Sequence, residues 1–143
     1  MISSSFSVET PWSAEQAFAY MSDMTNFSAW DPGTKAARLL DGEAGTADAV
    51  YELKAGVLTL RYQVTEHTAP DDFGAEAEHT LLRSSDSISV SATPTGSLIT
   101  YDATLHTRGV GRLLEPALHA AFPRMSDKAA EGLAKATNGR RIR

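Results

Sequence analysis

Between residues 35 and 107 the apolar side chains recur at every second position, and after Gly109 they recur at helical spacing. Alternation is typical of strands that bury one face, whereas a spacing of three or four residues is typical of an amphipathic helix. The links between the alternating segments are short, and short links join antiparallel strands. This order predicts an antiparallel meander followed by one long helix.

Six strands are expected in the meander, and one more is expected ahead of it at residues 4–10. The six occupy residues 35–40, 47–54, 57–67, 73–80, 87–93 and 98–107. Alternation is clearest in the third of these strands, where one face carries Leu58, Leu60, Tyr62 and Val64. The Ala55-Gly56 pair that precedes it is a two-residue link suited to a tight hairpin. We therefore expect seven strands.

Two short helices are expected between the first strand and the meander. Ser13 and Gln16 have the spacing of a capping box, which predicts a helix over residues 14–21 with Ser13 as its N-cap. Ser22 can cap a second short helical turn that runs through Phe27. A turn at Asp31-Pro32-Gly33 would end this region.

The apolar stripe after Gly109 continues to Ala136 and predicts one long helix. Pro116 fits this helix if it lies in the first turn, where proline is well tolerated. Pro123 lies further in, where a proline removes a backbone hydrogen bond and clashes with the preceding turn. We therefore expect a kink or a break near residues 118–122.

An antiparallel sheet with one apolar face must cover that face, and only the long helix is large enough to do so. The expected fold is therefore α+β, a curved seven-stranded antiparallel sheet around a long C-terminal helix with two short helices after the first strand. We expect residues 1–139 to form one domain and residues 140–143 to be a frayed basic tail. A sheet that wraps around one helix leaves space between them.

Composition limits the partners that such a domain would have. The 143 residues include no cysteine, which excludes disulfides, thiolate metal sites and cysteine nucleophiles. A net charge of −5 argues against a nucleic-acid partner. No apolar stretch approaches the roughly 20 residues of a membrane span, and no signal peptide is visible. We therefore expect a cytoplasmic protein, and the sequence indicates no particular oligomeric state.

Three segments resemble the SRPBCC (START-like, Bet v 1-like) superfamily. Residues 6–18, FSVETPWSAEQAF, are similar to its opening strand and the capped helix that a proline introduces. Residues 22–32, SDMTNFSAWDP, are similar to its second helix and the turn that contains a tryptophan. Residues 107–116, TRGVGRLLEP, resemble the passage into the closing helix in the polyketide cyclase/dehydrase branch.

This resemblance implies a helix-grip fold with an apolar cavity that takes lipids, sterols, polyketides or hormones. Phe27 and Trp30 would then close one end of the cavity, although they would also be explained if they only seal the core. The inward faces of the expected strands and the stripe of the last helix supply the other candidates. The expected ligand-binding residues are Phe27, Trp30, Tyr51, Leu60, Tyr62, Val90, Tyr101, Phe122 and Met125.

A polyketide cyclase or dehydratase would also need an acid–base pair. Alternation places His79 on the same face as Ala75 and Ala77, so we consider His79 and Tyr101 as candidate catalytic residues. No two of the four histidines have metal-ligand spacing, and no metal is expected. Gly109-x-Gly111 lacks the third glycine of a dinucleotide loop, so no cofactor is expected.

Three functions fit these observations. The first is binding of a small hydrophobic or aromatic ligand, lipid or polyketide-like, between the sheet and the C-terminal helix. The second is a cyclase or dehydratase that uses histidine and tyrosine in the same cavity. The third is an interaction module whose interior is filled by side chains, and the resemblance also allows a role in lipid or quinone handling.

Overall fold

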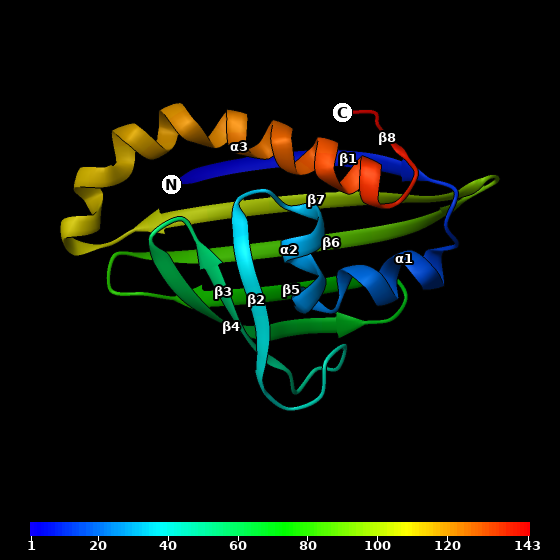
Figure 1. Cartoon of the computed structure of the whole chain (residues 1–143), viewed down its shortest axis with the longest axis horizontal. Coiled ribbons are helices and arrows are strands. Elements are labelled where there is room, and N and C mark those ends of the chain that lie inside the picture. Colours follow the sequence, from blue (N-terminus) through cyan, green and yellow to red (C-terminus); the bar gives the residue numbers. More distant parts are fainter.

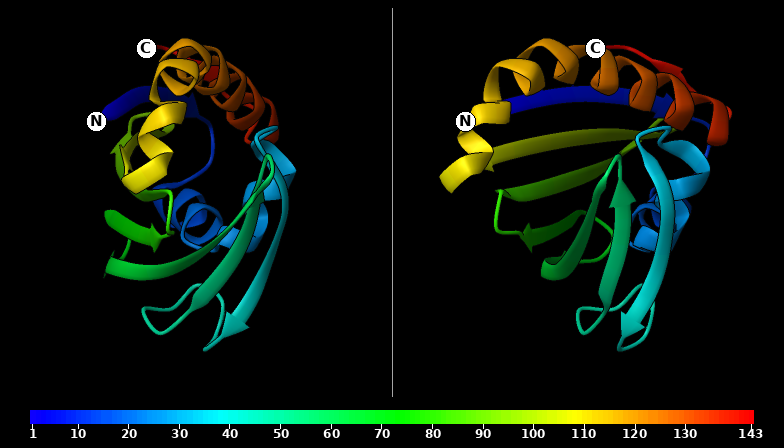
Figure 2. Two further views of the ribbon diagram at one scale, coloured as in Figure 1. Left: turned by 90° about the vertical axis from the view of Figure 1, so that its left-hand side faces the viewer. Right: turned by 60° about the vertical axis from the view of Figure 1, so that its left-hand side comes forward.

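An open sheet of eight antiparallel strands curves beneath a long C-terminal helix in the computed structural model, which describes all 143 residues (Figures 1 and 2). The elements in chain order are β1 (Ile2–Thr10), α1 (Ala14–Met21), η1 (Met24–Asn26), α2 (Phe27–Trp30), β2 (Thr34–Asp41), β3 (Val50–Ala55), β4 (Leu58–Thr68), β5 (Asp72–Glu78), β6 (Leu82–Thr93), β7 (Gly96–Thr107), η2 (Gly109–Leu114), α3 (Glu115–Ala136) and β8 (Arg140–Arg141). The expected α+β class and antiparallel meander are confirmed, with one additional short strand at the C-terminus.

The strand order is β2-β3-β4-β5-β6-β7-β1-β8, so the first strand joins the sheet beside the last strand of the meander. In that pairing Phe6 lies opposite Tyr101, and the two rings stack with centroids 5.4 Å apart. Because directly opposed residues point to the same side of a sheet, the register assigns each side chain to the concave or the convex face.

The two short helices begin at polar caps. Ser13 accepts a hydrogen bond from the Gln16 backbone N–H at 3.1 Å, as the sequence predicts for α1. The second helical segment is capped by Asp23, whose carboxylate accepts from the Thr25 N–H at 3.0 Å, and not by Ser22 as expected. Ser22 instead ends α1, because its N–H donates to the Phe18 carbonyl of the last turn.

Of the expected kink or break near residues 118–122, the break is wrong, because α3 runs without interruption through Pro123; Figure 1 shows the helix bent into an arch. Pro116 lies in the first turn, as expected. Pro123 and His119, which is one turn earlier, are both exposed. Water can therefore satisfy the carbonyl that the proline leaves without a donor.

The C-terminal residues are not frayed, and the expectation of a free tail is wrong for them. Arg140 and Arg141 form β8 and pair with Glu9 and Val8 of β1. The Arg141 guanidinium also contacts the Asp127 carboxylate of α3 at 2.7 Å. A two-residue edge strand shows no alternation, so the sequence pattern could not reveal it.

Helix α3 packs on the core mainly through its second half. Its second half buries Ala129, Ala130, Leu133 and Ala134 in the core, whereas most side chains of its first half are exposed. The helix packs on β1 and β8, which form one edge of the sheet, and on α2. None of the helices combines the length and the hydropathy that a bilayer-spanning segment requires.

Candidate functional site

A group of polar side chains lies on the otherwise apolar concave face of the sheet. Tyr62 comes from β4, Ser84 and Asp86 from β6, and Tyr101 from β7, and all four are less than a tenth exposed. The Tyr62 hydroxyl donates to the Ser84 hydroxyl at 2.9 Å. We name this group the interior polar cluster.

Small residues make room for the cluster. Asp86 lies directly between Ala75 of β5 and Ala103 of β7 in the register of the sheet. Tyr101 lies opposite Ile88, two positions further along β6, so Asp86 is its diagonal neighbour. Diagonal neighbours are within reach of a long aromatic side chain, and the Tyr101 hydroxyl accordingly interacts with the Asp86 carboxylate.

Burial dominates the electrostatics of the cluster. It raises the pKa of Asp86 to about 7, and the Tyr101 hydroxyl opposes that rise while the nearby charge of Asp31 adds to it. Burial likewise raises the pKa values of Tyr62 and Tyr101 well above 10, and the Asp86 charge raises both further. Near neutral pH the two tyrosines are therefore donors, and Asp86 exchanges a proton with its surroundings.

A second carboxyl stands beside the cluster, in the turn between α2 and β2. Asp31 accepts hydrogen bonds from the Gly33 N–H and the Thr34 hydroxyl, both at 2.9 Å. Burial raises its pKa, and these two hydrogen bonds oppose the rise. The Asp31 side chain therefore stabilises the turn through both hydrogen bonds, and its charge raises the pKa of Asp86.

Aromatic rings close the end of the concave face near α1 and α2. The Trp30 ring lies 5.0 Å from Phe27 and 5.6 Å from Tyr101, measured between centroids. Trp30 is only 2% exposed, and its indole N–H has no hydrogen-bond partner. This indole N–H is therefore a free donor next to the interior polar cluster. Leaving a buried donor unpaired costs about 1–3 kcal/mol.

The opposite end of the concave face is more open. Along β7 the side chains change from fully buried at Ile99 to partly exposed at Ala103 and Leu105. Val64 of β4, at the same level of the sheet as Ala103, is also partly exposed. Solvent therefore approaches the cluster from the side where the first half of α3 is not packed on the sheet.

Most of the expected ligand residues belong to one buried core. Phe27, Trp30, Tyr51, Leu60, Tyr62, Val90 and Tyr101 are all members of it. The Tyr51 hydroxyl accepts from the Gly45 N–H at 3.0 Å and points toward the Ser22 carbonyl, so it is engaged outside the interior polar cluster. Phe122 is buried outside this core, and Met125 on α3 is 43% exposed.

The structure does not bring His79 and Tyr101 together. His79 lies half-buried in the turn after β5, where its Nδ1 accepts from the Leu81 N–H at 3.1 Å. Its neighbour across the turn is Leu82, which pairs with Thr107, six positions along β7 from Tyr101. Six residues of strand span roughly 20 Å.

Sequence reasoning missed Asp86 and Ser84. The expected strand began at residue 87 because the polar run before it resembles a loop, whereas β6 begins at Leu82. Continuing the alternation of Ile88 backwards would have placed both residues on the inward face. No group of three or more histidine, aspartate or glutamate side chains is arranged to hold a metal ion.

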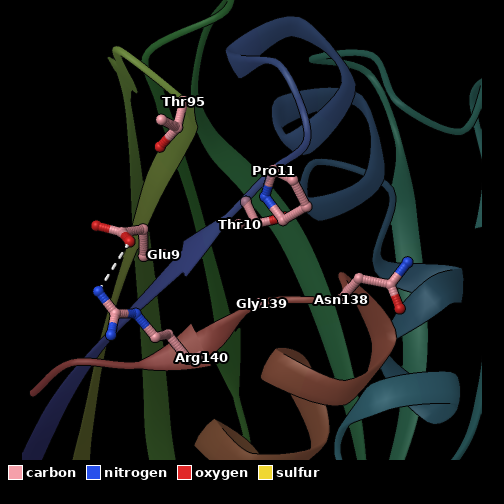
Figure 3. Close-up of a pocket in the computed structure, with 7 residues that line it drawn as sticks. All are labelled: Glu9, Thr10, Pro11, Thr95, Asn138, Gly139 and Arg140. Atoms are coloured by element: carbon pink, nitrogen blue, oxygen red, sulfur yellow. Dashed lines mark hydrogen bonds and ion pairs between the residues drawn. The ribbon is translucent and has the colours of Figure 1, made fainter.

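Two surface pockets lie away from these residues. One, of about 370 Å³, is an open depression between β1 and the end of α3, where Glu9 and Arg140 form an ion pair at 3.3 Å (Figure 3). Its lining residues are Glu9, Thr10, Pro11, Thr95, Asn138, Gly139 and Arg140. The other, of about 180 Å³, lies on β2 and β3. Neither contains an expected ligand residue.

Solved structures share this fold across almost the whole chain. A START superfamily protein from Mycobacterium smegmatis matches with a TM-score of 0.72 and 13% identity, covering 96% of each chain. Bacillus halodurans protein BH1534 matches with a TM-score of 0.71 and 13% identity over 96% of this chain and 97% of that one. The di-domain ARO/CYC StfQ from the steffimycin biosynthetic pathway matches with a TM-score of 0.68 and 10% identity, over 95% of this chain and 50% of StfQ.

Comparison with curated protein sequences finds no match. The family model described as polyketide cyclase / dehydrase and lipid transport matches residues 1–137. This match covers both short helices, all seven strands of the expected sheet and the whole of α3. The chain therefore belongs to the polyketide cyclase / dehydrase and lipid transport family, within the START-like fold.

Proposed function

We propose that the chain binds a small hydrophobic molecule, lipid or polyketide-like, between the concave face and α3, with its polar group at Asp86 and Tyr101. The observation that carries this proposal is the interior polar cluster beside the unpaired Trp30 indole N–H. A buried polar group without a partner is costly, and a ligand oxygen would satisfy it. Apolar rings or chains of the ligand would contact the aromatic end, where their desolvation drives binding.

The donors around the cluster specify the polar group of the ligand. The Trp30 indole N–H is free to donate, whereas the Tyr62 hydroxyl already donates to Ser84 at 2.9 Å and the Tyr101 hydroxyl already interacts with Asp86. Asp86 is a donor when protonated and an acceptor when ionised. This combination favours a ligand with a carbonyl or hydroxyl oxygen over one with a cationic head. We therefore expect ketones, phenols and fatty alcohols to bind better than amines of equal size.

Entry requires movement of the helix. The cluster is less than a tenth exposed, so a ligand of this size reaches it only if the first half of α3 bends away from the sheet while its start stays fixed at Gly111. That half contributes little buried surface, whereas the second half is anchored in the core. Local opening of weakly packed elements is the usual way to a closed apolar site.

Titration with an uncharged apolar fluorescent probe that carries a carbonyl group, such as Nile red, tests the binding proposal, together with mass spectrometry of copurifying small molecules. We expect saturable binding that Asp86→Ala weakens, because the ligand's polar group loses its partner. Asp102→Ala is the matched control, since Asp102 is an exposed carboxylate on the convex side of β7. Absence of saturable binding, or equal loss in the two variants, would contradict the proposal.

A second candidate function is a cyclase or dehydratase, as the family description allows. It is favoured by a buried carboxyl whose pKa of about 7 suits proton transfer at neutral pH. In this function Asp86 would take the role of base that the sequence suggested for His79, and Tyr101 would polarise a carbonyl. Turnover of a poly-β-ketone thioester that Asp86→Asn abolishes and His79→Gln preserves would support it. The reverse pattern would return the role to His79.

A further inference from the structure

Three large apolar side chains are exposed close together at the corner between β7 and α3. Val110 is 72% exposed, Leu113 is 82% exposed and Leu114 is 42% exposed. They lie in η2, which projects past the end of the sheet at the left of Figure 1, in yellow. Single exposed apolar residues are common on proteins, but clusters of them mark surfaces that bind something.

The backbone holds this corner rigidly. The Arg108 N–H donates to the Leu81 carbonyl of the β5–β6 turn at 2.8 Å. Gly111 is buried against the same carbonyl, and a side chain at this position would overlap with it. The apolar side chains on either side of Gly111 are therefore directed outward by a fixed backbone, so they cannot turn inward and pack on the sheet.

The corner is basic in an otherwise acidic chain. Residues 108–118 contain two exposed arginines, Arg108 and Arg112, and one carboxylate, Glu115, which pairs with the N-terminal amine of Met1 at 3.2 Å. The whole chain has a net charge of −5. Arginines therefore gather where the apolar side chains are exposed, and this combination fits an anionic surface that also has an apolar layer.

We propose that this tip, residues 108–118, docks on an anionic lipid bilayer, with Val110, Leu113 and Leu114 inserted among the lipids and Arg108 and Arg112 at the phosphates. A short apolar segment flanked by basic residues is suited to the boundary between headgroups and acyl chains. A protein partner fits less well, because stable protein interfaces bury about 800 Å² on each side and this tip is a narrow projection. Docking does not depend on whether the interior holds a ligand.

Cosedimentation with vesicles tests the proposal. Wild-type protein is mixed with vesicles of phosphatidylcholine alone or of an equimolar mixture with phosphatidylglycerol. We expect binding to the anionic vesicles only, weakened by high salt because screening reduces the arginine contribution. The double variant V110S/L113S should bind at least about tenfold more weakly, since two inserted side chains are lost.

Matched controls use exposed residues elsewhere on the chain. Val57→Ser removes an apolar side chain that is 99% exposed at the β3–β4 hairpin, and Arg61→Gln removes an exposed arginine on β4. Neither control should change vesicle binding, whereas Arg108→Gln with Arg112→Gln should reduce it. No binding of the wild type to anionic vesicles, or equal losses in controls and tip variants, overturns the proposal. Probe binding in the interior is measured on V110S/L113S as well, so failure of docking is distinguished from failure of the proposed function.

Discussion

Gly132 of α3 lies directly against the backbone carbonyl of Trp30 in α2, so closely that a side chain on Gly132 would overlap with it. This contact fixes the second half of α3 to the helix that closes the aromatic end of the concave face. The first half is fixed at its start, where Gly111 lies against the Leu81 carbonyl, but its side chains are mostly exposed and only Phe122 is buried. The second half of α3 is therefore tightly packed at the aromatic end of the concave face, whereas the first half is loosely packed at the other end.

Gly132→Ala should destabilise the protein, although the same change in a helix interior normally stabilises it by about 1 kcal/mol. The added methyl group cannot fit beside the Trp30 carbonyl unless α2 and α3 separate, and overpacking of this kind costs about 1–3 kcal/mol. Urea unfolding measures the change. Glu131→Ala, at the exposed neighbouring position, is the control and should lie within about 0.5 kcal/mol of wild type. A Gly132→Ala variant that is more stable than wild type would contradict the contact.

Asp86→Asn should stabilise the protein at pH 8 and have little effect at pH 4. The pKa of Asp86 is raised in the folded state, from 3.8 to about 7, so the folded protein binds the proton more tightly than the unfolded chain. Stability is then greatest below the unfolded pKa and is lost as pH rises through the interval from about 4 to 7. The asparagine variant lacks this loss, which is at most roughly 4 kcal/mol for a shift of about three units.

Urea unfolding at several pH values measures this difference, and Asp102→Asn is the control. Asp31 and Tyr101 are the ionisable groups that act on Asp86, and Tyr62 lies beside them. The tyrosines stay protonated over this interval because their pKa values are raised. A gain in stability that is independent of pH, or equal in the control, would show that Asp86 does not titrate in this range.

The sequence predicted most of the sheet because alternation and short links leave few other arrangements. It predicted α1 correctly to the residue, since Ser13 and Gln16 form a local cap that tertiary packing does not alter. It could not predict β8, whose two arginines are ordered only by the neighbouring β1. Elements that depend on distant partners carry no local pattern.

The candidate site was less accessible to sequence reasoning for the same reason. Tyr62 and Tyr101 were expected to face inward because their strands alternate clearly. Asp86 was missed because serines surround it in the sequence, and its raised pKa depends on burial by other strands. The sequence pattern placed His79 on the inward face by continuing the alternation of β5. The strand ends one residue earlier, at Glu78, and His79 lies in the turn, where its Nδ1 accepts from the Leu81 N–H.

Trp12→Phe should leave a protein whose fluorescence reports on the interior alone. The chain has two tryptophans, and Trp30 is the buried one beside Tyr101. We expect blue-shifted emission and weak quenching by acrylamide in Trp12→Phe, and the opposite in Trp30→Phe, which retains the half-buried Trp12. A ligand at the interior polar cluster should change the Trp30 emission saturably. Emission of Trp30 typical of water-exposed indole would contradict its placement.

Removal of residues 140–143 should cost more stability than Arg141→Ala. The ion pair of Arg141 with Asp127 is at the surface, and surface pairs contribute at most about 1 kcal/mol. The backbone of the same segment exchanges hydrogen bonds with Ser7, from the Ile142 N–H at 3.0 Å and to the Arg143 carbonyl at 3.3 Å. Truncation removes these bonds and leaves the edge of β1 unpaired. Thermal unfolding of the two variants measures the difference, and equal melting temperatures would show that β8 is held by its charges and not by its backbone.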